Sequence, residues 1–492
     1  MIHHCCRSSY FPREHYSVPE NNRIPHLLSC NSPTRFTSRR FESIKPDKQL
    51  DYVNDNGGPQ EYIDIVLSSL RSDTVKLRHA KKLQMFDLRR FMILSAVRET
   101  VLNFPGGIVK FTQELKFLSE STERIPCYRV LDDRGQLLSN NCMQIDKNIA
   151  LKMYKDMVML QTMDAIFYEA QRQGRISFYV TSIGEEAINI ASAAALTIDD
   201  FVFPQYREAG VQLWRGFTLQ DFADQCFGNT LDNGKGRQMP AHYGSKKHNY
   251  ITVASTVGTQ VLHAVGAAYS LKMEGKDACT ITYFGDGGSS TGDFHAALNF
   301  AAVMEAPVIL FCRNNGWAIS TPVTDQFRSD GVVVRGQAYG VRSIRVDGND
   351  ALAVFNAVQV ARKIAINESK PVLIEALTYR AGHHSTSDDS SKYRPIKDIE
   401  WWRLAQDPVA RFRKWLEGDD WWDSQAESEL REATRKEVLH AIQVAEKIEK
   451  PGLHEIFSDV YDVPPSNLSH QENSLREAVK KHQQDYPPDV PF

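Results

Sequence analysis

The 492-residue sequence has little of several features that would point to particular classes of protein. Its formal net charge is only −3 and the body of the chain has no basic run, so nothing favours nucleic-acid binding. No uninterrupted apolar stretch is long enough to span a bilayer, and we expect no membrane partner. The eight cysteines include no C-x-x-C pair, which argues against a disulfide scaffold or a zinc module.

What remains is the composition of a globular protein. Hydrophobic residues make up 42% of the chain and charged residues 24%, which is ordinary for a domain with a buried core. The length allows two to four domains. Residues 1–50 differ from the rest, because arginines are spread among many serines with few acids. They resemble a mitochondrial transit peptide; a disordered tail without an address is the alternative.

One pattern near the middle of the chain predicts chemistry. The apolar run Cys279–Phe284 leads into Gly285-Asp286-Gly287, and the apolar run Pro307–Cys312 leads to Asn314-Asn315. The segment between them has helical spacing, so the order is strand, turn, helix, strand. Both polar motifs then follow parallel strands at their carboxyl ends, where open α/β sheets bind ligands. A carboxylate and an amide oxygen there suit a hard divalent ion that holds phosphates. The alternative for Asp286 is an ordinary turn or N-cap residue.

This pattern resembles the signature of thiamine-diphosphate enzymes, a GDG triplet followed by a helix and a strand ending in NN. Three further segments resemble the alpha subunits of branched-chain 2-oxo acid dehydrogenases: Gln205–Gly210, Gly234–Pro240 and Tyr379–Asp389. The resemblance runs from about Gly57 to the C-terminus. It implies an α/β thiamine-diphosphate-binding fold, with a mainly parallel sheet flanked by helices, an extended N-terminal segment and a helical C-terminal region.

We therefore divide the chain at three predicted boundaries. Residues 1–50 form the transit peptide, 51–145 an N-terminal extended region, 146–400 the α/β domain, and 401–492 a helical C-terminal region and tail. Further elements are expected as helices over 146–174, 185–196, 258–273 and 427–450, strands over 201–203 and 371–379, a hairpin turn over 128–135 and a loop over 381–395.

The resemblance also assigns a cofactor site. It implies a magnesium ion held by Asp286, Asn315 and the backbone carbonyl of Trp317, where the family often has tyrosine. The diphosphate would be contacted by two arginines, which can each grip phosphate oxygens with two N–H groups, and by backbone amides at a helix N-terminus. For the arginines, a solvated or salt-bridged surface position is the alternative. The predicted cofactor contacts are Tyr206, Arg207, Ser255, Gly287, Gly288 and Arg313.

His384 is the candidate catalytic residue and a further cofactor contact. The family places the second histidine of this loop at the reactive end of the cofactor, where it donates or accepts a proton. An ordinary surface histidine is the alternative. Ser385 corresponds to the serine that a dedicated kinase phosphorylates in the family, and added negative charge there would disfavour the ordered loop. A solvated serine-rich loop without such a role is the alternative. A second family phosphorylation site falls at Pro395 and is therefore absent.

A second cation is implied by residues 254–260. This stretch resembles a loop that binds potassium in the branched-chain enzymes. Thr259 and Gln260 would supply side-chain oxygens, and Ala254 and Thr256 would supply carbonyls. An ordinary loop that precedes the 258–273 helix is the alternative.

The implied activity needs other chains. Thiamine catalysis requires a carboxylate against the aminopyrimidine ring, and the family takes it from a second domain that has no counterpart here. The resemblance implies a beta subunit in an α2β2 heterotetramer, a lipoyl-bearing acyltransferase core, a regulatory kinase and phosphatase, and the mitochondrial matrix. The reaction is oxidative decarboxylation of branched-chain 2-oxo acids with transfer of the acyl group to lipoamide. A pyruvate dehydrogenase alpha subunit and a noncatalytic regulatory paralogue are the alternatives.

Overall fold

A computed structural model gives the structure of the chain. It describes residues 101–104, 107–110, 112–115, 117, 123–139, 145–486 and 491. The chain divides into two compact units, Met1–Phe117 and Leu118–Phe492. The predicted transit peptide lies outside the described residues. In the first unit, β1 (Val101–Phe104) and β2 (Gly107–Lys110) pair antiparallel.

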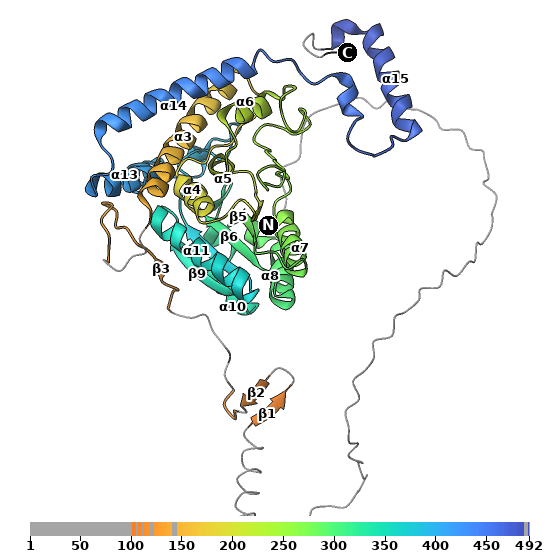
Figure 1. Ribbon diagram of the computed structural model, residues 1–492. Coiled ribbons are helices and arrows are strands. Elements are labelled where there is room, and N and C mark those ends of the chain that lie inside the picture. The colour runs from red at the N-terminus through yellow and green to blue at the C-terminus, as the bar shows by residue number, and fades with distance from the viewer. Residues whose placement is uncertain are drawn as a thin grey trace, which may run out of the picture. The chain divides into compact units, whose positions relative to one another are not determined.

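The second unit is built on a six-stranded sheet in which every pair of neighbouring strands is parallel (Figure 1). Parallel neighbours must be joined by crossover connections, which usually contain a helix, so strands that are consecutive in the sequence need not lie side by side. In spatial order the strands are β3 (Cys127–Tyr128), β9 (Arg342–Asp347), β10 (Val372–Leu377), β6 (Val308–Asn314), β5 (Thr280–Gly285) and β4 (Phe201–Phe203). A separate antiparallel pair, β7 (Trp317–Ala318) and β8 (Thr321–Pro322), follows β6.

Both faces of the sheet are buried, which explains why its central strands read as continuous apolar runs. Along β6, Ile309 and Phe311 belong to one hydrophobic cluster, whereas Leu310 and Cys312 belong to the other. This alternation is the period of two expected when successive side chains point to opposite faces. The fold is thus a sheet between two layers of helices.

One layer contains helices from widely separated parts of the chain. Its long helix α3 begins after Asp146, whose carboxylate accepts the backbone N–H groups of Asn148 and Ile149. Its members are α3 (Lys147–Arg172), α4 (Glu186–Ala194), α5 (Ala209–Trp214), α6 (Leu219–Phe227), α11 (Ala351–Glu368), α13 (Pro408–Gly418) and α14 (Ser424–Ala445).

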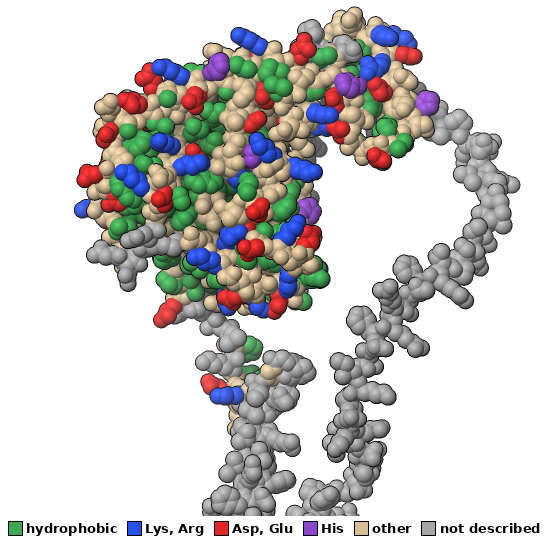
Figure 2. Space-filling model, viewed as in Figure 1, with side chains coloured by type: hydrophobic (Ala, Val, Ile, Leu, Met, Phe, Trp, Pro, Cys, Tyr) green, Lys and Arg blue, Asp and Glu red, His purple; other side chains and the backbone are tan. Residues whose placement is uncertain are grey.

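The opposite layer is smaller and is formed mainly by α7 (Thr259–Met273) and α8 (Gly292–Met304). The remaining helices are α9 (Val323–Gln326), α10 (Val333–Ala338), α12 (Ile396–Ala405) and α15 (Ser466–Lys481), with single 3₁₀ turns η1 (Gly288–Ser290), η2 (Ser390–Lys392), η3 (Leu453–Ile456) and η4 (Gln483–Asp485). In the described part of the chain, no helix combines the length and apolar character needed to cross a bilayer. Acidic and basic side chains are interspersed over the visible face (Figure 2).

The predicted α/β fold is confirmed, and most predicted elements occur within a few residues of their expected bounds. The C-terminal helix expected over 427–450 is α14, Ser424–Ala445, because Asp423 caps it earlier through the backbone N–H of Ala426. The expected turn over 128–135 exists, with a bridge between Leu131 and Leu137. However, Cys127–Tyr128 does not belong to a hairpin, since it pairs in parallel with β9 at the sheet edge. The predicted domain boundaries at 145/146 and 400/401 stay predictions.

Candidate active site

The turn after β5 holds Asp286 in a buried position, with 1% of its surface exposed. Its carboxylate Oδ2 accepts the side-chain N–H of Gln326 at 2.6 Å, from α9. The hydroxyl of Ser289 donates to the backbone carbonyl of Asp286 at 2.7 Å, which closes the turn. Burial raises the pKa of Asp286, and this effect outweighs the opposing hydrogen bond from Gln326 and the charge of Arg313. A cation at this carboxylate would reverse that effect.

The two glycines after Asp286 are closely packed, and Gly287 leaves no space for a side chain. Gly287 has an ordinary φ of −60°, so backbone strain does not demand glycine there. A Cβ atom at Gly287 would lie 2.7 Å from the Cβ of Ala318, and one at Gly288 would lie 3.1 Å from the Cβ of Phe284. The backbone of this turn therefore packs against β5 and β7 at a distance that other residues would prevent.

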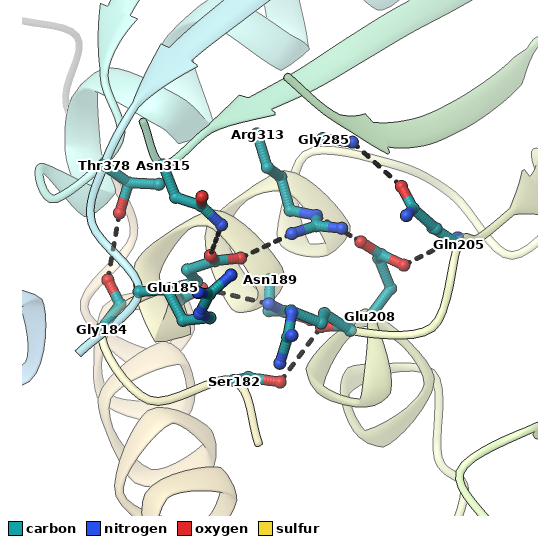
Figure 3. A network of polar contacts seen from close by, with 12 residues as sticks. Ser182, Gly184, Glu185, Asn189, Gln205, Glu208, Gly285, Arg313, Asn315 and Thr378 are labelled. Carbon is teal, nitrogen blue, oxygen red and sulfur yellow. Dashed lines mark hydrogen bonds and ion pairs between the residues drawn. The ribbon is translucent and has the colours of Figure 1, made fainter. Parts of the chain in front are cut away.

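Asn315 follows the neighbouring strand. The register pairs Gly285 of β5 with Arg313 of β6, so Asp286 and Asn315 emerge from adjacent strand ends. The side-chain N–H of Asn315 donates to Glu185 Oε1 at 2.7 Å (Figure 3). This bond fixes which end of the amide is nitrogen, and its oxygen accepts the backbone N–H of Trp317 at 3.2 Å. Asn315 thus has a defined oxygen for a hard cation.

Arg313 lies between two buried glutamates. Its guanidinium is 2.7 Å from Glu185 Oε2 and 2.5 Å from Glu208 Oε1, and all three side chains are at most 2% exposed (Figure 3). Burial alone would lower the pKa of Arg313, but the two carboxylates outweigh it and raise that pKa. Burial alone would raise the pKa of Glu185, but the charges of Arg313 and Arg207 outweigh it and hold that pKa low. Arg313 is therefore balanced by protein carboxylates, and its predicted contact with a diphosphate stays a prediction.

Arg207 links the segment before α5 to the loop that carries His384. One guanidinium nitrogen lies 3.2 Å from His384 Nδ1 and also donates to the backbone carbonyl of His384. The other donates to the carbonyl of Thr181 at 2.6 Å. The ring of Tyr206 meets the imidazole edge-on, with centroids 6.0 Å apart and planes at 80°. Residues 206, 207 and 384 thus share one site although the sequence separates them.

The His384 ring is held neutral. Burial lowers its pKa to about 3, and the positive charges of Arg207 and Arg380 add to that effect. Both guanidinium groups present N–H donors to Nδ1, at 3.2 and 3.5 Å, so Nδ1 accepts and the ring proton resides on Nε2. A bound diphosphate would oppose the two arginines and raise this pKa.

Short hydrogen bonds order the loop over 381–395. The carboxylate of Asp388 accepts the backbone N–H of His384 at 2.8 Å and the hydroxyl of Tyr393 at 2.6 Å. Ser385 is half-buried, and its hydroxyl accepts the backbone N–H of Ser387 at 3.3 Å. His383 Nδ1 accepts the backbone N–H of Ser390, so this histidine has a structural part in the loop.

The predicted potassium loop is only partly assembled. The hydroxyl of Thr259 lies 3.3 Å from the carbonyl of Thr256, so those two oxygens are together. Gln260 turns the other way, since its oxygen accepts the N–H of Gly258 and its nitrogen donates to the carbonyl of Tyr283. Ala254 is exposed. Nearby, the hydroxyl of Ser255 lies 2.8 Å from His242 Nε2.

Comparison with known proteins places this site in a family. A family model described as "Dehydrogenase E1 component" matches residues 154–454. The chain belongs to the dehydrogenase E1 component family. It is 67% identical over 394 residues to the mitochondrial 2-oxoisovalerate dehydrogenase subunit alpha 2 of Arabidopsis thaliana, covering 80% of this chain and 84% of that one.

More distant relatives of this E1 chain carry the same name. The 2-oxoisovalerate dehydrogenase subunit alpha of Homo sapiens is 48% identical over 388 residues, covering 78% of this chain and 87% of that one. The subunit alpha of Dictyostelium discoideum is 50% identical over 380 residues, covering 77% of this chain and 86% of that one. The predicted family resemblance is confirmed.

The E1 family implies thiamine diphosphate, and the residues of this turn fit its diphosphate end. The crowded glycine turn leaves backbone in place of side chains, and among the described residues a buried oxygen of Gln326 beside it has no hydrogen-bond partner. The predicted metal donors are one carboxylate, one amide oxygen and one carbonyl, a set that suits Mg²⁺. The structure's described residues contain no group of three His, Cys, Asp or Glu side chains placed to hold a metal, and this donor set needs none.

Several residues of this site were not identified from the sequence. Glu185 and Glu208 balance Arg313, Gln326 contacts Asp286, and the side-chain oxygen of Gln205 accepts the N–H of Gly285 at 2.9 Å. Polar residues beside apolar helices gave no signal of their own, because their partners lie far away in the chain. Gln205 and Glu208 both lie within the recognised segment Gln205–Gly210, but the sequence assigned neither of them a role.

Proposed function

We propose that this chain is the alpha subunit of the E1 component of a mitochondrial branched-chain 2-oxo acid dehydrogenase. The component decarboxylates branched-chain 2-oxo acids and passes the acyl group to lipoamide on an acyltransferase core. The single observation that carries the proposal is the convergence of the Asp286 turn and Asn315, at adjacent strand ends, in a chain 48–67% identical to 2-oxoisovalerate dehydrogenase alpha subunits. The relatives' names also support the mitochondrion, and we place the protein in its matrix.

The diphosphate end of the cofactor is held by this chain. Asp286, Asn315 and the carbonyl of Trp317 bind Mg²⁺, which neutralises the phosphates. Tyr206, Arg207, Ser255, Gly287, Gly288 and Arg313 contact the cofactor. The cofactor, when bound, would supply an electron sink for the decarboxylation. Because Glu185 and Glu208 compensate Arg313, this arginine contributes orientation more than net charge.

His384 donates or accepts a proton at the reactive end of the cofactor. Its Nε2 carries the ring proton while Nδ1 faces two guanidinium groups, so the ring presents a donor away from them. Because its pKa is low, the ring is a weak base and its protonated form is scarce near neutral pH, and added negative charge from a bound diphosphate would raise that pKa toward the working range. Acyl transfer to the lipoyl arm needs such a donor and acceptor.

The active unit is an α2β2 heterotetramer. The carboxylate that acts on the aminopyrimidine ring comes from the beta subunit, so this chain alone does not turn over substrate. Ser385 is the regulatory phosphorylation site of a kinase and phosphatase pair. Ser385 directly follows His384, whose backbone N–H donates to the carboxylate of Asp388. A phosphate on Ser385 therefore repels the diphosphate and the Asp388 carboxylate, and it loosens the loop. A K⁺ ion is held by oxygens of Ala254, Thr256, Thr259 and Gln260, once the side-chain amide of Gln260 has turned toward the other three.

Co-expression with a beta subunit tests this function. The assembled protein is expected to turn over 3-methyl-2-oxobutanoate far better than pyruvate, which separates it from a pyruvate dehydrogenase. Calorimetry is expected to show Mg²⁺-dependent binding of thiamine diphosphate, lost in Asp286→Ala and kept in Asp277→Ala, a matched change at an exposed position. Retained affinity in Asp286→Ala, or preference for pyruvate, would contradict the proposal. Cofactor binding without turnover would favour a noncatalytic paralogue.

A further inference from the structure

The proposed function gives no role to one buried carboxylate near the site, that of Asp164. Asp164 lies on α3 and is 0% exposed. Its Oδ1 accepts the hydroxyl of Tyr179 at 2.9 Å and its Oδ2 accepts the backbone N–H of Ser182 at 2.5 Å. Within the described part of the chain, Asp164 forms no salt bridge. A carboxylate that is buried without an ionic partner is costly, so its two hydrogen bonds have to offset that cost.

Both bonds hold the same short stretch, residues Tyr179–Ser182, which we call the bridging segment. It connects α3 with α4 and has no regular secondary structure. The ring of Tyr179 also stacks on Phe167 of α3, with centroids 5.4 Å apart and planes at 22°. The bridging segment is therefore fixed to α3 at both of its ends.

The bridging segment in turn holds Arg207. The carbonyl of Thr181 accepts a guanidinium N–H of Arg207 at 2.6 Å. The hydroxyl of Ser182 donates to the backbone carbonyl of Arg207 at 3.1 Å. Arg207 is thus held by its side chain and by its backbone, and both contacts come from residues of the bridging segment.

The other end of the bridging segment holds the loop that carries His384. The backbone N–H of Thr386 donates to the carbonyl of Tyr179 at 3.1 Å, and the backbone N–H of Tyr179 donates to the hydroxyl of Thr386 at 3.2 Å. Thr386 directly follows Ser385. The loop over 381–395 therefore joins the body of the protein through the segment that Asp164 fixes.

We propose that Asp164 is a positioning residue: through the bridging segment it holds Arg207 and the His384 loop in a fixed relation to each other. The proposal rests on the proposed function, since it assigns Asp164 to the same site. Asp164 touches neither cofactor nor substrate. It acts through Tyr179 and Ser182, at a depth where a single hydrogen bond is not replaced by water.

Titration of Asp164 should change this contact. Burial raises its pKa to about 7, against the opposing effects of its hydrogen bonds and of Arg207. The ionised form accepts from both donors, and charged acceptors make the stronger bonds. The loop is therefore held more tightly as the pH rises through about 7. The titratable and charged groups facing Asp164 are Tyr179, Arg207, Glu186, Cys226 and Tyr243.

Hydrogen exchange in the assembled α2β2 protein tests the proposal. Asp164→Asn puts an amide N–H against one of two donors. The peptide over 381–395 is expected to exchange about tenfold faster or more, as the loss of a charged hydrogen bond implies, while peptides of α3 keep wild-type rates. In the same variant kcat is expected to fall with an unchanged KM for the 2-oxo acid. The rise in loop protection through about pH 7 should disappear.

Two further variants keep the test decisive. Glu169→Gln removes the same charge from an exposed position of α3 and should exchange like wild type. Tyr179→Phe removes one of the two bonds with little change in volume, and it decides the question if Asp164→Asn does not assemble. The proposal would be overturned if the 381–395 loop exchanged within twofold of the wild-type rate in both Asp164→Asn and Tyr179→Phe. Absent turnover in the wild type would instead overturn the proposed function, and the exchange comparison would still stand.

Discussion

Replacing Glu185 with glutamine tests whether the buried charges around Arg313 balance as the structure indicates. Glu185 accepts from Arg313 at 2.7 Å and from the Asn315 amide at 2.7 Å, and it is 1% exposed. Removing one partner of a buried ion pair costs about 3–5 kcal/mol, because the other charge is left uncompensated. Glu208 stays 2.5 Å from Arg313, so we expect the lower end, about 3 kcal/mol.

The measurement is the free energy of unfolding by urea at neutral pH, with thermal unfolding beside it. A loss of about 3 kcal/mol corresponds to a midpoint lowered by roughly 4 °C in a unit of this size. The matched control is Glu432→Gln, which breaks an exposed pair with Lys436 on α14 and should cost about 0.5 kcal/mol or less. If Glu185→Gln stays within about 1 kcal/mol of wild type, the balance of charges described here is wrong.

The same variant has a predictable pH dependence. Burial alone would raise the pKa of Glu185, but Arg313 and Arg207 hold it below its ordinary value of 4.5. A carboxyl of lowered pKa contributes stability that is present above pH 4.5 and is lost as the pH falls through the folded-state value. The stability difference between wild type and Glu185→Gln should therefore shrink on acidification below that pH. A difference that stays constant would show that charge is not its cause.

Three other changes have expected outcomes. Gly287→Ala should weaken Mg²⁺-dependent cofactor binding at least tenfold by calorimetry, since its Cβ has no space, whereas Gly266→Ala, where nothing lies within 4 Å, should raise stability by about 0.5–1 kcal/mol. Equal affinities for the two variants would contradict the steric argument. Gln326→Leu removes the donor to Asp286 and should raise the Mg²⁺ Kd about tenfold, while unchanged titrations would exclude an orienting part for Gln326. Ser385→Glu should lower turnover in the reconstituted complex, and normal activity there would remove the inhibitory role of that serine.

The sequence by itself determined the fold class and the two polar motifs, at Asp286 and Asn315, that follow neighbouring strands. Apolar runs of strand length followed by Gly285-Asp286-Gly287 and by Asn314-Asn315 predicted parallel strands with polar carboxyl ends, and the parallel β5–β6 pair confirms this arrangement. These signals are local: a buried strand needs apolar side chains on both faces, and a tight turn needs glycine, so both are visible in a few consecutive residues.

Other elements were not predicted. The edge strand β3 has two residues, and its pairing with β9 crosses more than two hundred positions of sequence. No periodicity can be read from two residues, so the turn that follows them was the only visible feature. The strand β9 was not expected either, although Ile344–Asp347 alternates apolar and charged side chains.

Only the tertiary structure decided which polar residues support the site. Glu185, Glu208, Gln326 and Asp164 are acids and amides like many others in the chain, and each has a function only through a partner brought close by folding. It also decided that Arg313 faces two glutamates, where the sequence offered an arginine free to bind phosphate. The physical reason is that hydrogen bonds and ion pairs depend on distances of about 3 Å, which chain order does not specify.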